Sequence, residues 1–101
     1  MIPNDMSKAS VGARLRILRH ALDGSNASAF CRRVGWKPNQ LSNYESGSQY
    51  PRMDQLDKLH RNTLVGLDYV LRGDLSSTPE GLAIKIRHWA EQLSELDRDA
   101  G

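Results

Sequence analysis

The sequence has very few residues that cross-link a chain or bind a metal. It contains one cysteine, Cys31, and three histidines among 101 residues. A lone cysteine cannot form an internal disulfide, and histidines scattered along the chain cannot complete a cysteine-rich zinc site with it. Secreted disulfide scaffolds and zinc fingers are therefore excluded. No serine or cysteine has the flanking glycines of a nucleophile elbow either, so we expect no enzyme activity, no metal and no cofactor.

Long apolar runs and strand-like alternation are missing as well. No stretch approaches the roughly 20 apolar residues that span a bilayer, and residues 1–5 lack the charged and apolar regions of a signal peptide. We therefore expect a cytoplasmic protein without a membrane segment. Apolar and polar residues do not alternate with a period of two anywhere, so the expected fold class is all-α. A chain of this length is about one domain.

Acidic residues are scarce in the front half of the chain. From Ser7 to Arg52, eight Lys and Arg face only Asp23 and Glu45, a balance of +6. From Asn62 to the end, four basic residues face seven acidic ones, a balance of −3. This asymmetry indicates that the first part of the protein meets a polyanion. The alternative is that both halves simply present solvated charged faces.

The first helix is predicted by apolar residues at intervals of four, three and four, which places them on one face: Val11, Leu15, Leu18 and Leu22. Ser10 is the expected N-cap, and the Asp23-Gly24 pair is expected to end the helix. A second, short helix follows a cap at Asn26 or Ser25 and ends at Gly35. Its apolar face holds Phe30, Cys31 and Val34.

The third helix is expected to begin at Pro38 and to close at Gly47, with Leu41 and Tyr44 pointing inward. Three more helices follow in the prediction. Met53, Leu56 and Leu59 mark the fourth, residues 67–71 form the fifth with Gly73 at its end, and Thr78-Pro79 starts a sixth that runs to about Asp97.

The sixth helix carries apolar residues at alternating intervals of four and three, the seam pattern of a coiled coil: Leu82, Ile86, Trp89, Leu93 and Leu96. Two interpretations stay open at this point. The seam mediates self-association, or it packs back onto the same chain. The predicted organisation is a domain over residues 8–73, a linker over 74–79, and an amphipathic C-terminal helix over 80–97.

Residues 27–47 satisfy the geometry of a helix-turn-helix. Two helices joined by a turn of about three residues cross steeply, so the first needs a small side chain at the crossing, and Cys31 supplies it as a buried residue. Gly35 supplies the residue that tolerates positive φ in the turn. Leu41 and Tyr44 anchor the second helix on the first, and Trp36 is expected to pack under the turn.

At this point the sequence resembles the Cro/phage-repressor class of helix-turn-helix regulators, also called the xenobiotic-response-element family. The resemblance covers residues 8–73. It is carried by the basic first helix, the Leu-Ser-Asn-Tyr-Glu-Ser-Gly segment over 41–47, Pro51, and the Leu-Asp-Tyr-Val-Leu-Arg-Gly segment over 67–73. It implies a five-helix, lambda-repressor-like DNA-binding domain whose third helix enters the major groove. It also implies an ion pair between the first helix and Glu45, for which Arg14 is the candidate.

The outer face of the third helix is expected to present three carboxamides together. With Leu41 and Tyr44 turned inward, these are Asn39, Gln40 and Asn43. Asn and Gln are the side chains that bond adenine through its N6 and N7 atoms, so the three are the candidate base-reading residues. The alternative is that they are polar residues that merely face water.

Contacts to DNA phosphates are expected from residues that flank this helix. The principal candidates are Lys37 and Arg52, with a hydroxyl from Ser42. Arg14, Arg32 and Arg33 are weaker candidates. The family's usual glutamine at the start of the second helix is replaced by Ala27, so its contact must come from Asn26, from Ser28, or from nowhere.

These observations predict a transcription regulator, most simply a repressor, that binds double-stranded operator DNA as a homodimer. Symmetric dimers of this kind read two half-sites roughly 34 Å apart. One alternative is an antitoxin that represses its own operon while its C-terminal helix binds a toxin. Another is an interaction adaptor that kept the fold without binding DNA. In either of these the C-terminal helix would meet a protein partner.

Overall fold

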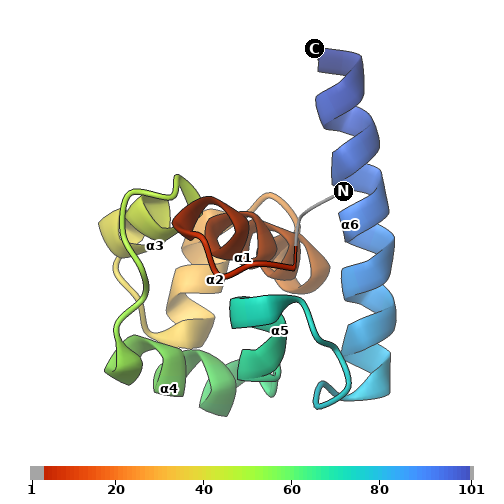
Figure 1. The fold of residues 1–101 in the computed structure, drawn as a ribbon. Coiled ribbons are helices and arrows are strands. Elements are labelled where there is room, and N and C mark those ends of the chain that lie inside the picture. Colours follow the sequence, from red (N-terminus) through yellow and green to blue (C-terminus); the bar gives the residue numbers. More distant parts are fainter. Residues whose placement is uncertain (1–3, 101) are drawn as a thin grey trace.

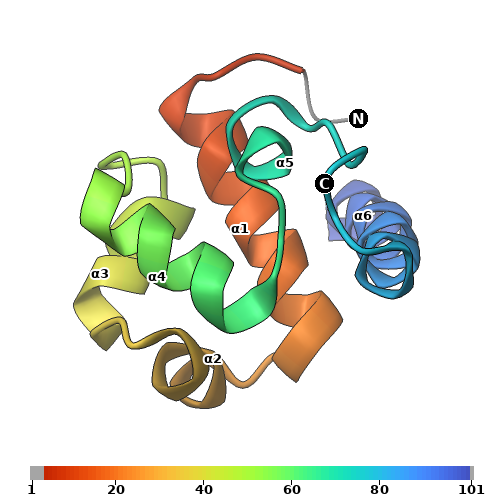
Figure 2. The same ribbon diagram turned by 90° about the horizontal axis from the view of Figure 1, so that it is seen from below.

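The protein is built entirely from helices around a central first helix. The computed structural model describes residues 4–100, and every regular element in that range is a helix. The expected all-α architecture with an additional C-terminal helix is confirmed. α1 lies in the middle, with α3 on one side and α6 on the other (Figure 1, Figure 2). The helices are α1 (Lys8–Asp23), α2 (Ala27–Val34), α3 (Pro38–Glu45), α4 (Met53–Thr63), α5 (Leu67–Arg72) and α6 (Glu80–Ala100).

The start of α1 differs from the sequence-based expectation. The N-cap is Ser7, whose Oγ accepts the Ser10 N–H at 3.1 Å, so Ser10 is inside the helix and is buried. The earlier cap is favoured because the Ser7 hydroxyl satisfies a backbone N–H that the first turn leaves without a helical partner. The end is as expected, since the N–H of Gly24 caps the helix on the carbonyl of His20 at 3.1 Å.

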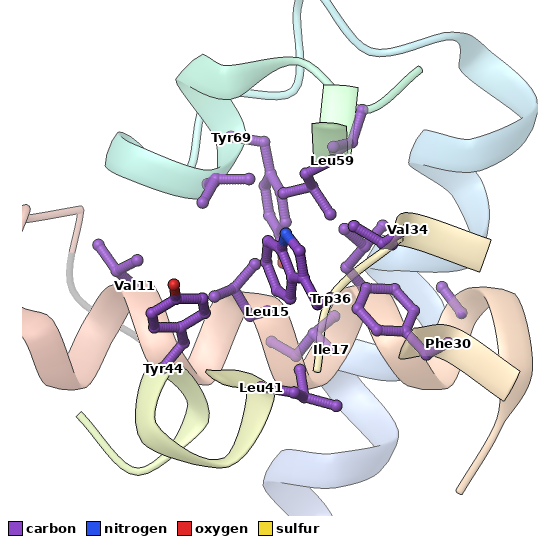
Figure 3. Packing of buried hydrophobic residues seen from close by; sticks show 14 of the residues in the cluster. Val11, Leu15, Ile17, Phe30, Val34, Trp36, Leu41, Tyr44, Leu59 and Tyr69 are labelled. Carbon is purple, nitrogen blue, oxygen red and sulfur yellow. The ribbon is translucent and has the colours of Figure 1, made fainter. Parts of the chain in front are cut away.

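The core gathers side chains from each of the six helices α1 to α6, and Trp36 lies near its middle. The Trp36 ring meets the Tyr44 ring edge-on at 5.1 Å and the Phe30 ring at 6.1 Å, and its Nε1 donates to the backbone carbonyl of Gln55 at 3.1 Å. Figure 3 shows this indole near the middle of the buried cluster, beside α1. One residue thus ties the turn between α2 and α3 to α4. Met53 does not share this core: it is 83% exposed, because it is the first residue of α4.

α6 packs against the rest of the chain with part of its apolar seam. Ile86 and Leu93 are buried in the common core, with 1% and 4% of their surface exposed. The Trp89 ring lies 5.3 Å from the ring of His20 on α1. Assigning Ile86 and Leu93 to a surface between two chains is therefore wrong, because their apolar area is already removed from water inside one chain. Leu96, by contrast, is 58% exposed.

α1 and α3 approach each other closely at Gly12. A β-carbon at this position would lie 2.7 Å from the Glu45 carbonyl oxygen and closer still to that of Tyr44. Both obstacles are backbone atoms of α3, which cannot move without moving the helix. The absence of a side chain at Gly12 therefore sets how α3 is seated on α1.

Gly12→Ala should lower the free energy of unfolding by about 1–3 kcal/mol, the usual cost of forcing extra atoms into a packed contact. Gly81→Ala is the matched control, because a β-carbon at Gly81 in α6 meets nothing within 4 Å. Replacing that exposed helical glycine should leave stability unchanged or raise it by up to about 1 kcal/mol. Urea denaturation measures both, and equal midpoints for Gly12→Ala and the unmodified chain would contradict the close approach.

Candidate nucleic-acid interface

The turn between α2 and α3 is set by caps at both of its ends. Asn26 begins α2 by accepting the Ala29 N–H at 2.9 Å. Gly35 ends it in the left-handed conformation, with φ of 86°, and its N–H bonds the Cys31 carbonyl at 2.8 Å. α3 then starts at Pro38, so the turn is the three residues 35–37. This confirms the predicted helix-turn-helix geometry.

The outer face of α3 carries two of the three predicted carboxamides. Leu41 and Tyr44 are buried, as expected, with 3% and 4% exposed. Asn39 is exposed and Asn43 is half-buried, and they are four residues apart on the side away from that buried pair. The two amides therefore occupy neighbouring turns of one helix face.

Gln40 has a different environment from the two asparagines. Its Oε1 accepts the backbone N–H of Lys37 at 2.9 Å, which satisfies a free donor at the start of α3. The side chain is half-buried and lines a cleft beside the helix rather than its outermost face. Of the three predicted base-reading residues, Gln40 therefore differs from Asn39 and Asn43. As the third residue of α3, it is well placed to cap the start of the helix.

The predicted phosphate-contacting residues are mostly at the surface. Lys37, Ser42, Arg52 and Ser28 are all exposed. The Arg52 side chain is 73% exposed and makes a long, 3.4 Å ion pair with Asp54, which costs little to release. The Asn26 amide oxygen is engaged in capping α2, so only its nitrogen remains to bind a ligand.

Among the weaker candidates, two arginines are engaged by other groups of the same chain. Arg33 forms a two-bond pair with Asp23 at 3.0 Å for both bonds. Arg14 is 2% exposed and donates to the backbone carbonyls of Val70 at 3.1 Å and Asp5 at 2.8 Å. Burial lowers the pKa of the Arg14 guanidinium. Arg32 is exposed.

The ion pair expected between Arg14 and Glu45 is made by Arg19 instead. Arg19 Nε and Nη2 donate to the two carboxylate oxygens of Glu45 at 2.8 and 2.9 Å. This hydrogen bonding to Glu45 raises the pKa of Arg19. Five helical residues rotate by about 140° beyond a full turn, so Arg14 and Arg19 face different neighbours. The pair cancels the charge of an acid that belongs to α3 itself.

A cleft beside α3 contains residues that sequence reasoning missed. It has a volume of about 390 Å³ and is lined by Lys8, Gln40, Tyr44, Ser48, Gln49, Tyr50 and Arg52. Lys8 was counted only in the charge balance of the front half, and the sequence predicted no functional role for Gln49 or Tyr50. No sequence pattern could have grouped them, because the cleft joins the start of α1 to the segment between α3 and α4.

Metal binding finds no support in the described part of the chain. Within it, no three His, Cys, Asp or Glu side chains come together as ligands would.

Burial raises the pKa of the Cys31 thiol, so it is protonated and unreactive at neutral pH, as a core residue would be. Nor is any described helix both long enough and apolar enough to cross a membrane.

Arg19→Gln should lower the free energy of unfolding by about 2 kcal/mol, because it leaves a largely buried carboxylate without its charged partner. Arg61→Gln is the matched control, because the ion pair of Arg61 with Asp57 has a similar length, 3.0 Å, but its side chains are 66% and 61% exposed. That control should cost under about 1 kcal/mol. Chemical denaturation at pH 7 measures the free energy of unfolding of both variants. Equal losses would show that the Arg19–Glu45 pair stabilises the fold no more than the control pair does.

The comparisons with known proteins agree with this geometry. A family model described as a helix-turn-helix domain matches residues 10–68, more than half of the 101-residue chain. The matched range begins inside α1, ends inside α5 and includes the whole of α2 and α3. Searches of curated proteins and of solved structures found no match. The chain therefore belongs to the helix-turn-helix family of DNA-binding domains.

Proposed function

We propose that this protein is a sequence-specific transcription regulator of the Cro/phage-repressor type, acting as a repressor that reads the major groove of operator DNA with α3. The observation that carries the proposal is the composition of the outer face of α3. Asn39 and Asn43 stand there on adjacent turns, and the one acid of the helix, Glu45, is neutralised by Arg19. Such a face can approach phosphate-lined DNA without repulsion.

Base reading is assigned to the two asparagines. An asparagine amide can donate to adenine N7 and accept from adenine N6 at once, and each such pair discriminates against a wrong base by about 1–3 kcal/mol. Lys37 at the start of α3 and Arg52, which lines a cleft together with Gln40 of α3, supply exposed cations next to this helix. Regulation then works by occupancy of the operator and needs no chemistry.

Selection of bound sequences from a random duplex pool, followed by salt titration, tests this function. Binding should weaken steeply with salt, and Lys37→Ala should weaken all sequences alike while lowering the salt slope by about 1. Asn39→Ala and Asn43→Ala should each relax the choice of base at one position. Gln92→Ala, an amide on α6, is the control and should change neither property.

Absence of salt-sensitive duplex binding by the unmodified chain would refute the regulator and favour an adaptor. A change in affinity without a change in sequence preference for both asparagine variants would remove them as base readers.

The proposed homodimer forms through one flank of α6. With Ile86 and Leu93 buried, the less buried seam residues are Leu82, Trp89 and Leu96, which recur every seven residues, although Leu82 and Trp89 also pack in part against the core. A seven-residue apolar repeat along a helix is the pattern by which two copies pair. The first two residues are half-buried, and Leu96 is 58% exposed. We therefore assign the second copy to this flank.

Leu96→Glu should convert the dimer to a monomer, because it places a charge in the paired flank. Ile84→Glu is the matched control: Ile84 is 57% exposed but lies on a different side of α6. Sedimentation measures the mass of each form. Cutting the chain after Gly73 is a poorer test, since it would expose the core around Ile86. A dimer that persists in Leu96→Glu would exclude this interface.

A further inference from the structure

The cleft lined by Lys8 and Arg52 is rich in hydrogen-bond donors and has no acid in its lining. None of its seven lining residues is Asp or Glu. Lys8 and Arg52 contribute cations, and Ser48 and Gln49 contribute a hydroxyl and an amide. The nearest acid with a contact to the lining is Asp54, whose long ion pair with Arg52 is solvent-exposed. The chemistry of the cleft therefore favours an anion.

Gln40 adds a donor whose direction is set by its capping bond. Its Oε1 is occupied by the Lys37 N–H at 2.9 Å, so the amide group still free to bind a ligand is the Nε2 donor. A base contact of the adenine type requires the donor and the acceptor of one amide together. One lone pair of the Gln40 oxygen is already used by the cap of α3, whereas both hydrogens of Nε2 are available, and a donor suits an anion.

Tyr50 holds the two sides of the cleft together. Its hydroxyl donates to the Met6 carbonyl at 2.6 Å, which ties the segment after α3 to the residues before α1. Its ring lies 5.7 Å from the Lys8 Nζ, a cation–π distance. The ammonium is thus positioned before any ligand arrives, and less side-chain freedom is lost on binding.

The cleft borders the reading face, because Gln40 follows Asn39 directly in α3. An anion in the cleft would therefore lie next to the bases that α3 reads. We propose that the cleft binds one phosphodiester of the operator backbone through Lys8, Arg52 and the Nε2 of Gln40, and that Gln40 contacts this phosphate instead of a base. The inference rests on the proposed function, since it names a contact of the same interface.

Lys8→Gln tests the cleft without disturbing the caps of α3. Because Arg52 still contacts the same phosphate, loss of Lys8 should lower the salt slope by up to about 0.9 and, by that slope, weaken binding to the selected duplex up to about eightfold at 0.1 M salt, equally for every sequence. Lys85→Gln is the matched control, because it removes the same charge from an exposed site on α6. It should leave the slope unchanged.

Gln40→Glu separates a phosphate contact from a base contact. A glutamate keeps the oxygen that accepts the Lys37 N–H, but it replaces the donor with a negative charge inside the cleft. We expect weaker binding to all sequences, with thermal unfolding unchanged. A shift of the preferred base at one position, with affinity retained, would make Gln40 a base reader and overturn the inference.

A duplex with a single uncharged methylphosphonate locates the phosphate. Placed in turn along the selected operator, the substitution should weaken binding by the unmodified protein at each contacted phosphate, and at one of these positions Lys8→Gln should add no further loss. Additive losses at every position would overturn the inference, and so would an unchanged salt slope in Lys8→Gln. Both results leave the proposed function standing. Failure of the unmodified protein to bind any duplex would defeat the two together.

Inorganic phosphate distinguishes the operator backbone from a free anion as the ligand. At constant ionic strength, exchanging chloride for phosphate should leave duplex affinity unchanged within a factor of two. Millimolar phosphate that binds through Lys8 to the free protein and equally to the protein–duplex complex would identify a free-phosphate site apart from the DNA and overturn the assignment to DNA.

Discussion

The seating of α3 on α1 is the constraint on which the rest of the protein depends. Gly12 lets the carbonyl groups at the end of α3 rest directly on α1, where any β-carbon would collide with them. The Glu45 side chain then accepts two hydrogen bonds from Arg19, which also lies on α1. The backbone contact at Gly12 and the ion pair with Arg19 both involve Glu45. Two separate interactions therefore fix the angle between α3 and α1.

Some basic residues of the front half of the chain stabilise the fold, and others remain available to a ligand. Arg14, Arg19 and Arg33 are occupied by internal carbonyls or carboxylates. Lys37 stays exposed at the start of α3, and Arg52 stays exposed in the cleft beside this helix. Part of the basic excess of the front half therefore holds helices together, and the rest stays at the surface around α3.

α6 likewise serves two purposes with one apolar seam. The residues that point most directly at α1, Ile86 and Leu93, complete the core. A helix face wide enough to pack on a domain extends beyond a strict coiled-coil seam, and the flank left over here is Leu82, Trp89 and Leu96. The helix is therefore part of the folded domain, and its remaining flank is the surface that we propose for a second copy.

Several features follow from residues a few positions apart, and the sequence determined them by itself. These are the all-helical class, the end of α2 at Gly35, the three-residue turn, and the inward direction of Leu41 and Tyr44. Helical periodicity and capping are local interactions, so they can be read along the chain. The same reasoning misplaced the cap of α1 by three residues, because Ser7 and Ser10 are both acceptable there.

Only the tertiary structure decided which neighbours those faces meet. Periodicity shows that Arg14 and Arg19 lie on different faces of α1, but not which face Glu45 will reach. It cannot show that Lys8 and Arg52, far apart in the chain, line one cleft, or that the Gln40 oxygen caps α3. Nor can it divide the seam of α6 between the core and the surface. Each of these is a contact across the fold, and its geometry exists only once the helices have packed.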